Sequence, residues 1–251
     1  MPFLPPNGAL HGFALDRLLT WNLLTIFWLF VASQILIVLA LVTRNLRAKA
    51  AAAPRKPHPA AVFILAELLP LLAITGLYVW MMFTSHRLWA ERREPGNVRG
   101  AVRVEVTGVQ FQWYFRYPGD DGIYGATLPT LVRAPAGNPL GLDPRDPHSR
   151  DDIVSSVLVL PAGEPVDLTL RSQDVIHGFF IPGMRLKQDA IPGMTGHLRF
   201  TPTVPGSYPI LCSQVCGLGH QRMQALLRVV SPAGYQQWLA ARERALAEAG
   251  Q

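Results

Sequence analysis

The two cysteines of the chain lie in one short segment together with a histidine and a methionine. The segment, CSQVCGLGHQRM (212–223), contains Cys212, Cys216, His220 and Met223. Thiolate, imidazole and thioether groups are soft ligands, and a set of this kind favours copper. The simpler interpretation is a structural disulfide, which an extracytoplasmic protein would permit. Because four soft ligands gather within twelve residues, the segment favours a metal site.

The residues around this segment indicate how it is positioned. SYPILC (207–212) and MQALLRVV (223–230) have the pattern of strands, so the ligand segment joins two strands. Gly217 and Gly219 allow the connecting loop to fold tightly. A second histidine, His177, lies upstream in SQDVIHGFF, at the end of another predicted strand, and supplies a ligand that the local motif lacks.

Two thiolates and two histidines restrict the kind of metal centre. A single blue-copper centre uses one thiolate, two histidines and a weak axial ligand. Tetrahedral zinc accepts two cysteines and two histidines, but a methionine and closely spaced cysteines on a loop between strands are not typical of a zinc module. Two copper ions bridged by both thiolates, each with one histidine and one weak ligand, would use every residue of the set.

From Val98 onward the sequence has the pattern of an antiparallel β-sandwich or barrel. Short alternating apolar segments are separated by turns rich in Gly, Pro and Asp. Residues 118–152 lack this periodicity and are expected to form a long surface excursion. The segment that begins at Pro232 has helical composition, with the proline suited to the first helical position. We therefore predict a β domain over 98–231 and a C-terminal helix within 232–251.

The first part of the chain contains two long apolar segments. Residues 21–43 and 60–84 each suffice for a helix that crosses a hydrocarbon core of about 30 Å. A cleaved signal peptide is the alternative for the first segment, but its apolar run is too long and no small-residue cleavage site follows it. We therefore predict helices over about 20–43 and 60–84, joined by a loop over 44–59, in a transmembrane hairpin that occupies residues 1–97.

The charge of the predicted loop indicates the orientation of the hairpin. The loop has five basic residues and no acidic one: Arg44, Arg47, Lys49, Arg55 and Lys56. The positive-inside rule places the loop in the cytoplasm and both termini, with the β domain, on the periplasmic side of a bacterial-type inner membrane. From Val98 onward the chain has 14 Lys/Arg and 13 Asp/Glu residues, so the formal net charge of +6 comes mainly from the loop. Nucleic acid is therefore not an expected partner.

In this order and spacing the motifs resemble subunit II of cytochrome c oxidase, the subunit of haem–copper oxidases that carries the binuclear copper centre CuA. Besides CSQVCGLGHQRM, the resemblance rests on GVQFQWYFRYP (108–118) and DVIHGFFIPGMRLKQDAIPGM (174–194), and it covers nearly the whole chain. It implies a membrane-anchored all-β protein, in which a two-helix hairpin precedes a cupredoxin-like Greek-key β-sandwich.

The resemblance also implies a function in the respiratory chain. The subunit would accept electrons from a c-type cytochrome and pass them to haem in subunit I, where oxygen is reduced and protons are pumped. Subunit I, the other oxidase subunits and membrane lipid would be its partners. The sequence has no C-x-x-C-H motif, so the donor would be a separate protein.

Six copper ligands follow from the resemblance, five through side chains and one through a backbone carbonyl: His177, Cys212, Cys216, His220, Met223 and the carbonyl of Gln214. Both cysteines would bridge the two ions, and each histidine would bind one of them. The family commonly has glutamate at position 214, where its side chain helps to bind magnesium. An amide is a poorer magnesium ligand than a carboxylate, so magnesium is an open question here. Asp174, three residues before His177, is expected to orient that histidine.

Three further residues are candidates for a functional role. Phe111 aligns with the tryptophan through which electrons arrive in the family, and Trp113 with the second aromatic residue of that segment. The alternative is that both are ordinary strand and core residues. Glu67 is a charge inside a predicted membrane helix, one turn from the family's proton-uptake glutamate, and the alternative is a hydrogen bond between helices.

Two other functions are compatible with parts of the sequence. A CuA-bearing subunit of a nitric oxide reductase would share the metal site and differ in its partner subunit. A membrane-anchored copper-delivery protein would present exposed Met/His-rich loops with labile metal. The ligands of this chain instead come from the strand ends of a predicted β domain, which favours the oxidase subunit.

Overall fold

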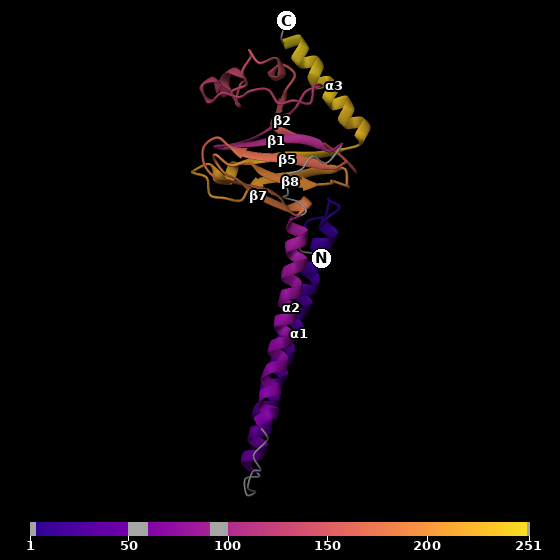
Figure 1. Cartoon of the computed structure of the whole chain (residues 1–251), viewed down its shortest axis with the longest axis vertical. Helices are drawn as coiled ribbons and strands as arrows, with labels where there is room; N and C mark the ends of the chain where they lie inside the picture. The colour runs from indigo at the N-terminus through magenta and orange to yellow at the C-terminus, as the bar shows by residue number, and fades with distance from the viewer. Residues whose placement is uncertain (1–3, 50–59, 91–99, 250–251) are drawn as a thin grey trace. The chain divides into compact units, whose positions relative to one another are not determined.

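A computed structural model describes residues 4–49, 60–90 and 100–249 of the chain (Figure 1). The chain divides into two compact units. A helical unit comprises Ala14–Trp89, and a second unit comprises Met1–Phe13 together with Ala90–Gln251. All the strands that the described residues form belong to the second unit.

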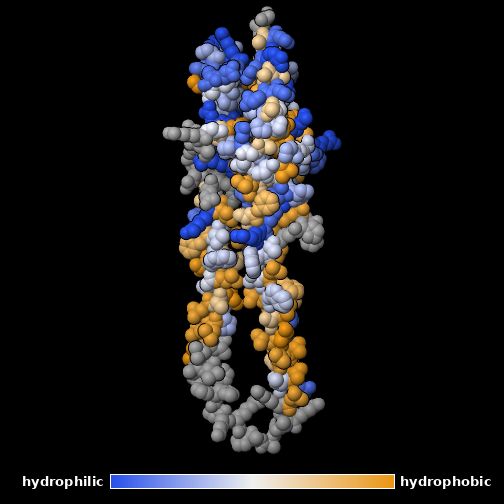
Figure 2. Space-filling view, turned by 90° about the vertical axis from the view of Figure 1, so that its right-hand side faces the viewer, coloured by the Kyte–Doolittle hydropathy of each residue, from blue (hydrophilic) through white to orange (hydrophobic). Residues whose placement is uncertain are grey.

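Two long helices, α1 (Gly12–Lys49) and α2 (Ala60–Ala90), account for the helical unit. Both are long and apolar enough to cross a membrane. Many of their large apolar side chains are exposed, among them Phe30, Leu39 and Leu72. Figure 2 shows the described part of the two helices as mainly orange, that is, hydrophobic. Exposing this much apolar surface is unfavourable in water and favourable in lipid. The prediction of two apolar helices is confirmed, and α1 extends beyond the predicted segment at both ends.

Two predictions on the helical unit fall outside the described residues. The backbone of Glu67 lies within α2, but its side chain is not described, and neither are residues 50–59 of the predicted basic loop. A role of Glu67 in proton uptake and the orientation of the hairpin therefore stay predictions.

Within the described residues, ten strands form two five-stranded sheets (Figure 1). One sheet has the order β3-β2-β1-β5-β8, and the other has the order β4-β10-β9-β6-β7. The strands are β1 (Val102–Val109), β2 (Gln112–Tyr117), β3 (Ile153–Ser155), β4 (Val157–Pro161), β5 (Val166–Ser172), β6 (His177–Ile181), β7 (Leu186–Ala190), β8 (Gly196–Phe200), β9 (Gly206–Cys212) and β10 (Gln224–Val230). The chain changes sheet after β3, β4, β5, β7 and β8. Strands that are distant in sequence are therefore neighbours in space.

Apolar side chains from both sheets form one core. In β5, Val166, Leu168 and Leu170 are buried, and the more polar residues between them are more exposed, as the period of a strand requires. Phe179 of β6 and Ile210 of β9 contribute to the same core from the opposite sheet. Burying each such side chain stabilises the fold by about 1.5–3 kcal/mol. The predicted β-sandwich is confirmed, but two of its strand pairs, β1–β5 and β4–β10, are parallel rather than antiparallel.

The long excursion after β2 is tied to the sheet by a buried ion pair. It contains three short 3-10 helices, η1 (Pro129–Leu131), η2 (Ala134–Ala136) and η3 (Pro147–Ser149). Arg116 of β2 donates to the carboxylate of Asp152 and to the carbonyl of Gly125, and the side chains of Arg116 and Asp152 are buried. The Arg116 guanidinium also lies 5.2 Å from the centre of the Tyr124 ring. These contacts order a segment whose sequence has no periodicity.

The N-terminal residues pack on the β-sandwich. The sequence assigned residues 1–97 to the hairpin, whereas the structure groups the described residues 4–13 with the strands. The amide of Gly8 donates to the carbonyl of Gly183 at 2.8 Å, and the amide of Thr203 donates to the carbonyl of Gly8 at 2.7 Å. The side chain of Ala9 is fully buried. The segment therefore contributes backbone hydrogen bonds and a core side chain to the β unit.

The C-terminal helix α3 (Pro232–Ala249) packs on the sandwich through aromatic side chains. Trp238 meets Tyr117 edge to face, with ring centres 4.9 Å apart. Ser231 caps the helix, because its hydroxyl accepts a hydrogen bond from the amide of Gly234 at 3.2 Å. Pro232 occupies the first helical position, where a missing amide hydrogen costs nothing.

Candidate metal centre

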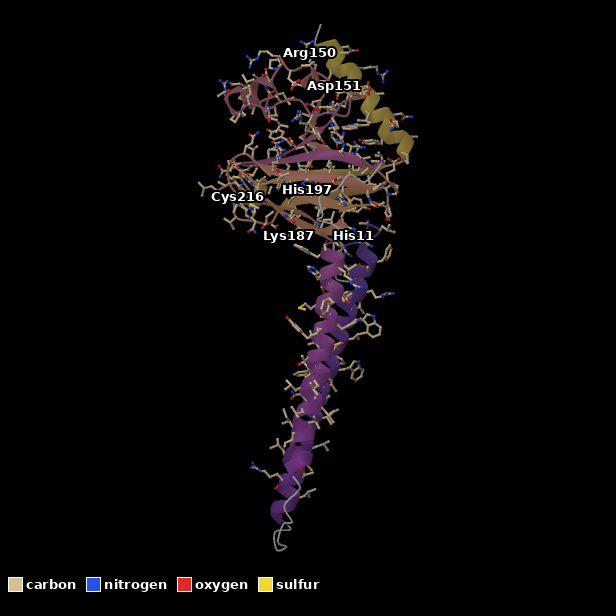
Figure 3. All side chains as sticks on the ribbon, in the orientation of Figure 1. His11, Arg150, Asp151, Lys187, His197 and Cys216 are labelled. Atoms are coloured by element: carbon tan, nitrogen blue, oxygen red, sulfur yellow. The ribbon has the colours of Figure 1, made fainter. Side chains whose placement is uncertain are left out.

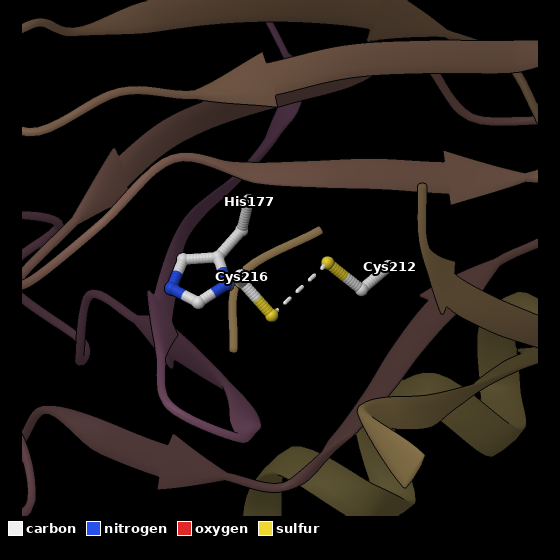
Figure 4. Close-up of side chains that lie close together, drawn as sticks. All are labelled: His177, Cys212 and Cys216. Carbon is white, nitrogen blue, oxygen red and sulfur yellow. Dashed lines mark hydrogen bonds between the residues drawn. The ribbon is translucent and has the colours of Figure 1, made fainter. Parts of the chain in front are cut away.

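The six predicted ligands come from the ends of neighbouring strands and from the loop between β9 and β10. His177 is the first residue of β6, Cys212 is the last residue of β9, and Met223 directly precedes β10. Strand β9 pairs with both β6 and β10, so the loop after Cys212 returns beside the start of β6. Figure 4 shows the side chains of His177, Cys212 and Cys216 converging at this point.

The ligand atoms lie within a few ångströms of one another. One ring nitrogen of His177 and the sulfur atoms of Cys212 and Cys216 are all within 4.8 Å of each other. The Cys216 sulfur lies 3.7 Å from Nδ1 of His220 and 3.8 Å from the sulfur of Met223. The Cys212 sulfur lies 3.2 Å from the carbonyl oxygen of Gln214. The structure thus brings together all six residues that the sequence predicted.

The two cysteines are free thiols, with their sulfur atoms 3.8 Å apart. A disulfide bond requires about 2.05 Å, so the structure contains two separate donors. Burial raises the pKa of the Cys216 thiol to about 11, and the hydrogen bond and charge of Cys212 act in the same direction. Two thiolates this close are therefore unfavourable without a positive charge between them. A bound cation removes this penalty, since metal ligation deprotonates thiols.

His177 is oriented so that one ring nitrogen is available to a metal. The residue is fully buried, and its Nε2 atom lies 2.7 Å from Oδ1 of Asp174. Its buried Nδ1 atom has no hydrogen-bond partner among the described residues. Burial raises the pKa of Asp174, but hydrogen bonds from His177 and from the amides of Gln110 and Val175 outweigh it, and the pKa lies below the ordinary value. Asp174 therefore stays ionised and holds the imidazole, the arrangement expected of a metal-binding histidine.

The donor set fits copper. It consists of two thiols, two imidazoles, one thioether and one carbonyl, and softness of this kind selects copper over magnesium or calcium. The buried Nδ1 atom of His177 has no hydrogen-bond partner among the described residues, and the two cysteine sulfurs are not joined by a disulfide bond. Both are therefore available to bind a metal ion.

The candidate aromatic residues differ in their exposure. The Phe111 side chain is 38% exposed, and its ring lies against the ligand loop: a Cβ atom added to Gly219 would come within 2.4 Å of the ring. A Cβ atom added to Gly217 would lie 3.1 Å from this ring, and Gly217 has a φ of +139°, a conformation that favours glycine. Trp113 is fully buried and meets the His177 ring edge to face at 5.7 Å.

The side chain of Gln214 is hydrogen-bonded to the carboxylate of Asp189. Its Nε2 atom donates to Oδ2 of Asp189 at 2.8 Å, and Oδ1 of Asp189 accepts from Nζ of Lys187 at 3.1 Å. Magnesium needs several oxygen ligands in octahedral geometry. The Asp189 carboxylate here accepts hydrogen bonds from Gln214 and Lys187, and no magnesium site is assigned.

One residue of the site was not predicted. The backbone amide of Gln110 donates to Asp174, and its side-chain amide donates to the carbonyl of Cys216. The sequence contained a weak signal, since Gln110 adjoins Phe111 in the aromatic segment. Its partners lie 64 and 106 residues away, so periodicity could not reveal them.

Fold and site together define the class of protein: a β-sandwich domain with a cluster of soft metal ligands at one end. Comparison with known proteins gives the particular family. The model of the family described as cytochrome c oxidase subunit II, periplasmic domain, matches residues 102–230. The chain belongs to this family.

Individual relatives agree with this assignment. The alternative cytochrome c oxidase subunit 2 of Bradyrhizobium diazoefficiens is 38% identical over 166 residues, which cover 65% of this chain and 55% of the relative. A probable cytochrome c oxidase subunit 2 of Streptomyces avermitilis is 30% identical over 210 residues, covering 78% and 64% of the two chains. The chain therefore spans only 55% to 64% of the length of these relatives.

A similar solved structure is the periplasmic domain of subunit II of cytochrome oxidase from Bradyrhizobium japonicum. It is 24% identical to this chain, with a TM-score of 0.44, and the alignment covers 59% of this chain and 97% of that domain.

Proposed function

We propose that this chain is the electron-transfer subunit of a haem–copper oxygen reductase and that its metal site holds the binuclear copper centre CuA. The observation that carries the proposal is the pair of free thiols 3.8 Å apart, surrounded by two imidazoles, a thioether and a carbonyl. Such a set supplies two bridging thiolates and separate terminal ligands for each of two ions. Membership of the subunit II family supports it.

The resemblance to the family implies the role of each ligand. Cys212 and Cys216 would bridge the ions, His177 and His220 would each bind one, and the remaining two ligands would be Met223 and the carbonyl of Gln214. When bound, copper would supply a one-electron redox couple. The chain's own contribution is rigidity, because strand ends and a buried core hold the ligands in place. Little movement would then accompany a change of charge.

The exposure of the aromatic residues supports one path for incoming electrons. A soluble c-type cytochrome can touch only surface residues. Phe111 is partly exposed and lies against the ligand loop, whereas Trp113 is enclosed. We therefore assign the accepting position to Phe111. Electrons would leave toward the haem of subunit I, where oxygen is reduced and protons are pumped.

Two apolar helices support anchoring in a bacterial-type inner membrane. The proposed topology has both termini and the β unit on the periplasmic side, where a soluble donor is present. Lipid, subunit I and other oxidase subunits would be the partners in the membrane. Glu67 would contribute to proton uptake from the cytoplasmic side.

Ligand burial argues against the copper-delivery alternative. His177, Cys216 and Met223 are 0%, 5% and 1% exposed. A delivery protein must hand its metal to a partner through an accessible site, and these three ligands are not accessible. Buried ligands of this kind favour a site that retains its metal, although Cys212 and His220 are partly exposed.

Reduction of the copper-loaded chain by a c-type cytochrome tests the proposal. The full chain would be purified in detergent, loaded with copper and mixed anaerobically with a reduced c-type cytochrome. We expect two copper ions per chain and the uptake of one electron per chain, both lost in C216S. Binding of two copper ions without any oxidation of the cytochrome would contradict the electron-transfer role. A chain that retains zinc in preference to copper would contradict the metal assignment.

A further inference from the structure

We infer that Gln110 is a positioning residue that joins the two separate parts of the metal site. One part is the start of β6, with His177, and the other is the loop after β9, with Cys216. The inference rests on the proposed function, because it concerns the ligands of the proposed copper centre. It assigns a role to a residue that is not itself a ligand.

The first link runs from the backbone of Gln110 to the histidine. Its amide donates to Oδ2 of Asp174 at 2.7 Å. The other oxygen of the same carboxylate, Oδ1, lies 2.7 Å from Nε2 of His177. One carboxylate therefore connects the turn between β1 and β2 to the imidazole.

The second link runs from the side chain of Gln110 to the cysteine loop. Its Nε2 atom donates to the backbone carbonyl of Cys216. The next residue, Gly217, would place an added Cβ atom 2.9 Å from the same Nε2 atom and 3.1 Å from the Phe111 ring. The loop therefore lies directly against residues 110 and 111, and only glycine fits there.

The two links act on different ligands through a single residue. A change in the side chain of Gln110 removes the bond to Cys216 and leaves the bond from its backbone to Asp174. The Cys216 sulfur lies within 3.8 Å of the ligand atoms of Cys212, His220 and Met223. A shift of the Cys216 backbone would move this sulfur and so disturb most of the ligand set. The side chain of Gln110 would thus set how closely the cysteine loop approaches His177.

The chain offers a matched control two residues further on. Gln112 is also a glutamine of the β1–β2 segment, and it is likewise exposed. Q110M and Q112M both exchange an amide for an apolar side chain of similar length. They differ in that, among the described residues, Gln110 donates to the carbonyl of Cys216 and Gln112 does not.

Copper retention and reduction potential of the full chain in detergent provide the test. Wild-type protein must first bind two copper ions, and failure at this stage would count against the proposed function. We then expect Q110M to lose roughly 10- to 100-fold in copper affinity, the usual effect of removing a hydrogen bond behind a ligand. Its reduction potential and copper EPR spectrum should also change, while Q112M stays like wild type.

Folding of the variants is checked by the Tm of the metal-free protein, which should be alike for Q110M and Q112M. If Q110M does not fold, Q110E takes its place, because a carboxylate of the same size cannot donate to the Cys216 carbonyl. The inference would be overturned if the folded Gln110 variant had the same copper affinity, reduction potential and EPR spectrum as Q112M.

Discussion

Oδ1 of Asp174 lies 2.7 Å from Nε2 of His177, three residues further along the chain. The contact fixes the plane of the imidazole and leaves the buried Nδ1 atom free of any hydrogen-bond partner in the described part of the chain. Asp174 is thus part of the metal site even though it is not among the proposed ligands.

D174A should weaken copper binding by roughly 10- to 100-fold, because the histidine loses the group that orients it. Competition with a copper chelator measures the affinity. E248A, which removes an exposed acid of α3, controls for the change of net charge. Equal affinities in D174A and E248A would show that the carboxylate does not position His177.

The ion pair of Arg116 and Asp152 should contribute strongly to stability. Their side chains are 2% and 0% exposed. D152A removes the nearer of two carboxylates from the buried guanidinium and leaves Glu105 at 3.6 Å, so it should cost about 3 kcal/mol, the lower end for a broken buried pair. R145A breaks the pair of Arg145 with Asp143, in which Arg145 is 79% exposed, and should cost no more than about 1 kcal/mol. Chemical denaturation of the two variants compares the losses, and similar losses would refute the distinction.

His148 and Asp121 should titrate as a linked pair. The hydrogen bond between them raises the pKa of His148 and lowers the pKa of Asp121. His148 contributes its stabilisation fully below the ordinary histidine pKa of about 6.5 and loses it as the pH rises through the raised pKa. Asp121 contributes its stabilisation fully above the ordinary pKa of an aspartate. This stabilisation is lost as the pH falls through the lowered pKa of Asp121. NMR titration should show a lower pKa of His148 in D121N, and an unchanged value would contradict the pairing.

The N-terminal segment should behave as part of the β unit. Ala9 is fully buried, so A9L overfills the core and should cost about 1–3 kcal/mol. L10A, which changes a side chain that is 62% exposed, serves as the control. Thermal unfolding of the full chain compares them. An A9L protein as stable as L10A would mean that the segment does not pack as described.

Much of this structure was predictable because its signals are local. The alternation of Val166, Leu168 and Leu170 indicates a strand with one buried face, and the spacing of Cys212, Cys216, His220 and Met223 indicates a metal site. The resemblance to subunit II added the role of the Gln214 carbonyl. All six predicted ligands lie together in the structure.

What could not be predicted depends on contacts between distant residues. Residues 4–11 have no periodic sequence pattern that would reveal their packing. Their backbone hydrogen bonds with Gly183, Thr201 and Thr203 join parts of the chain that are far apart in sequence. The order of the excursion likewise depends on Arg116 reaching Asp152. Gln110 is unremarkable in sequence and acquires a role only when β1, β6 and β9 are assembled.

Electron paramagnetic resonance of the copper-loaded full chain tests the central claim most directly. The six ligands of the proposed centre predict two copper ions per chain and, in the oxidised protein, one unpaired electron shared equally between both nuclei. The hyperfine pattern reports this sharing. A spectrum of one isolated copper ion, or a Cys212–Cys216 disulfide that excludes copper, would contradict it.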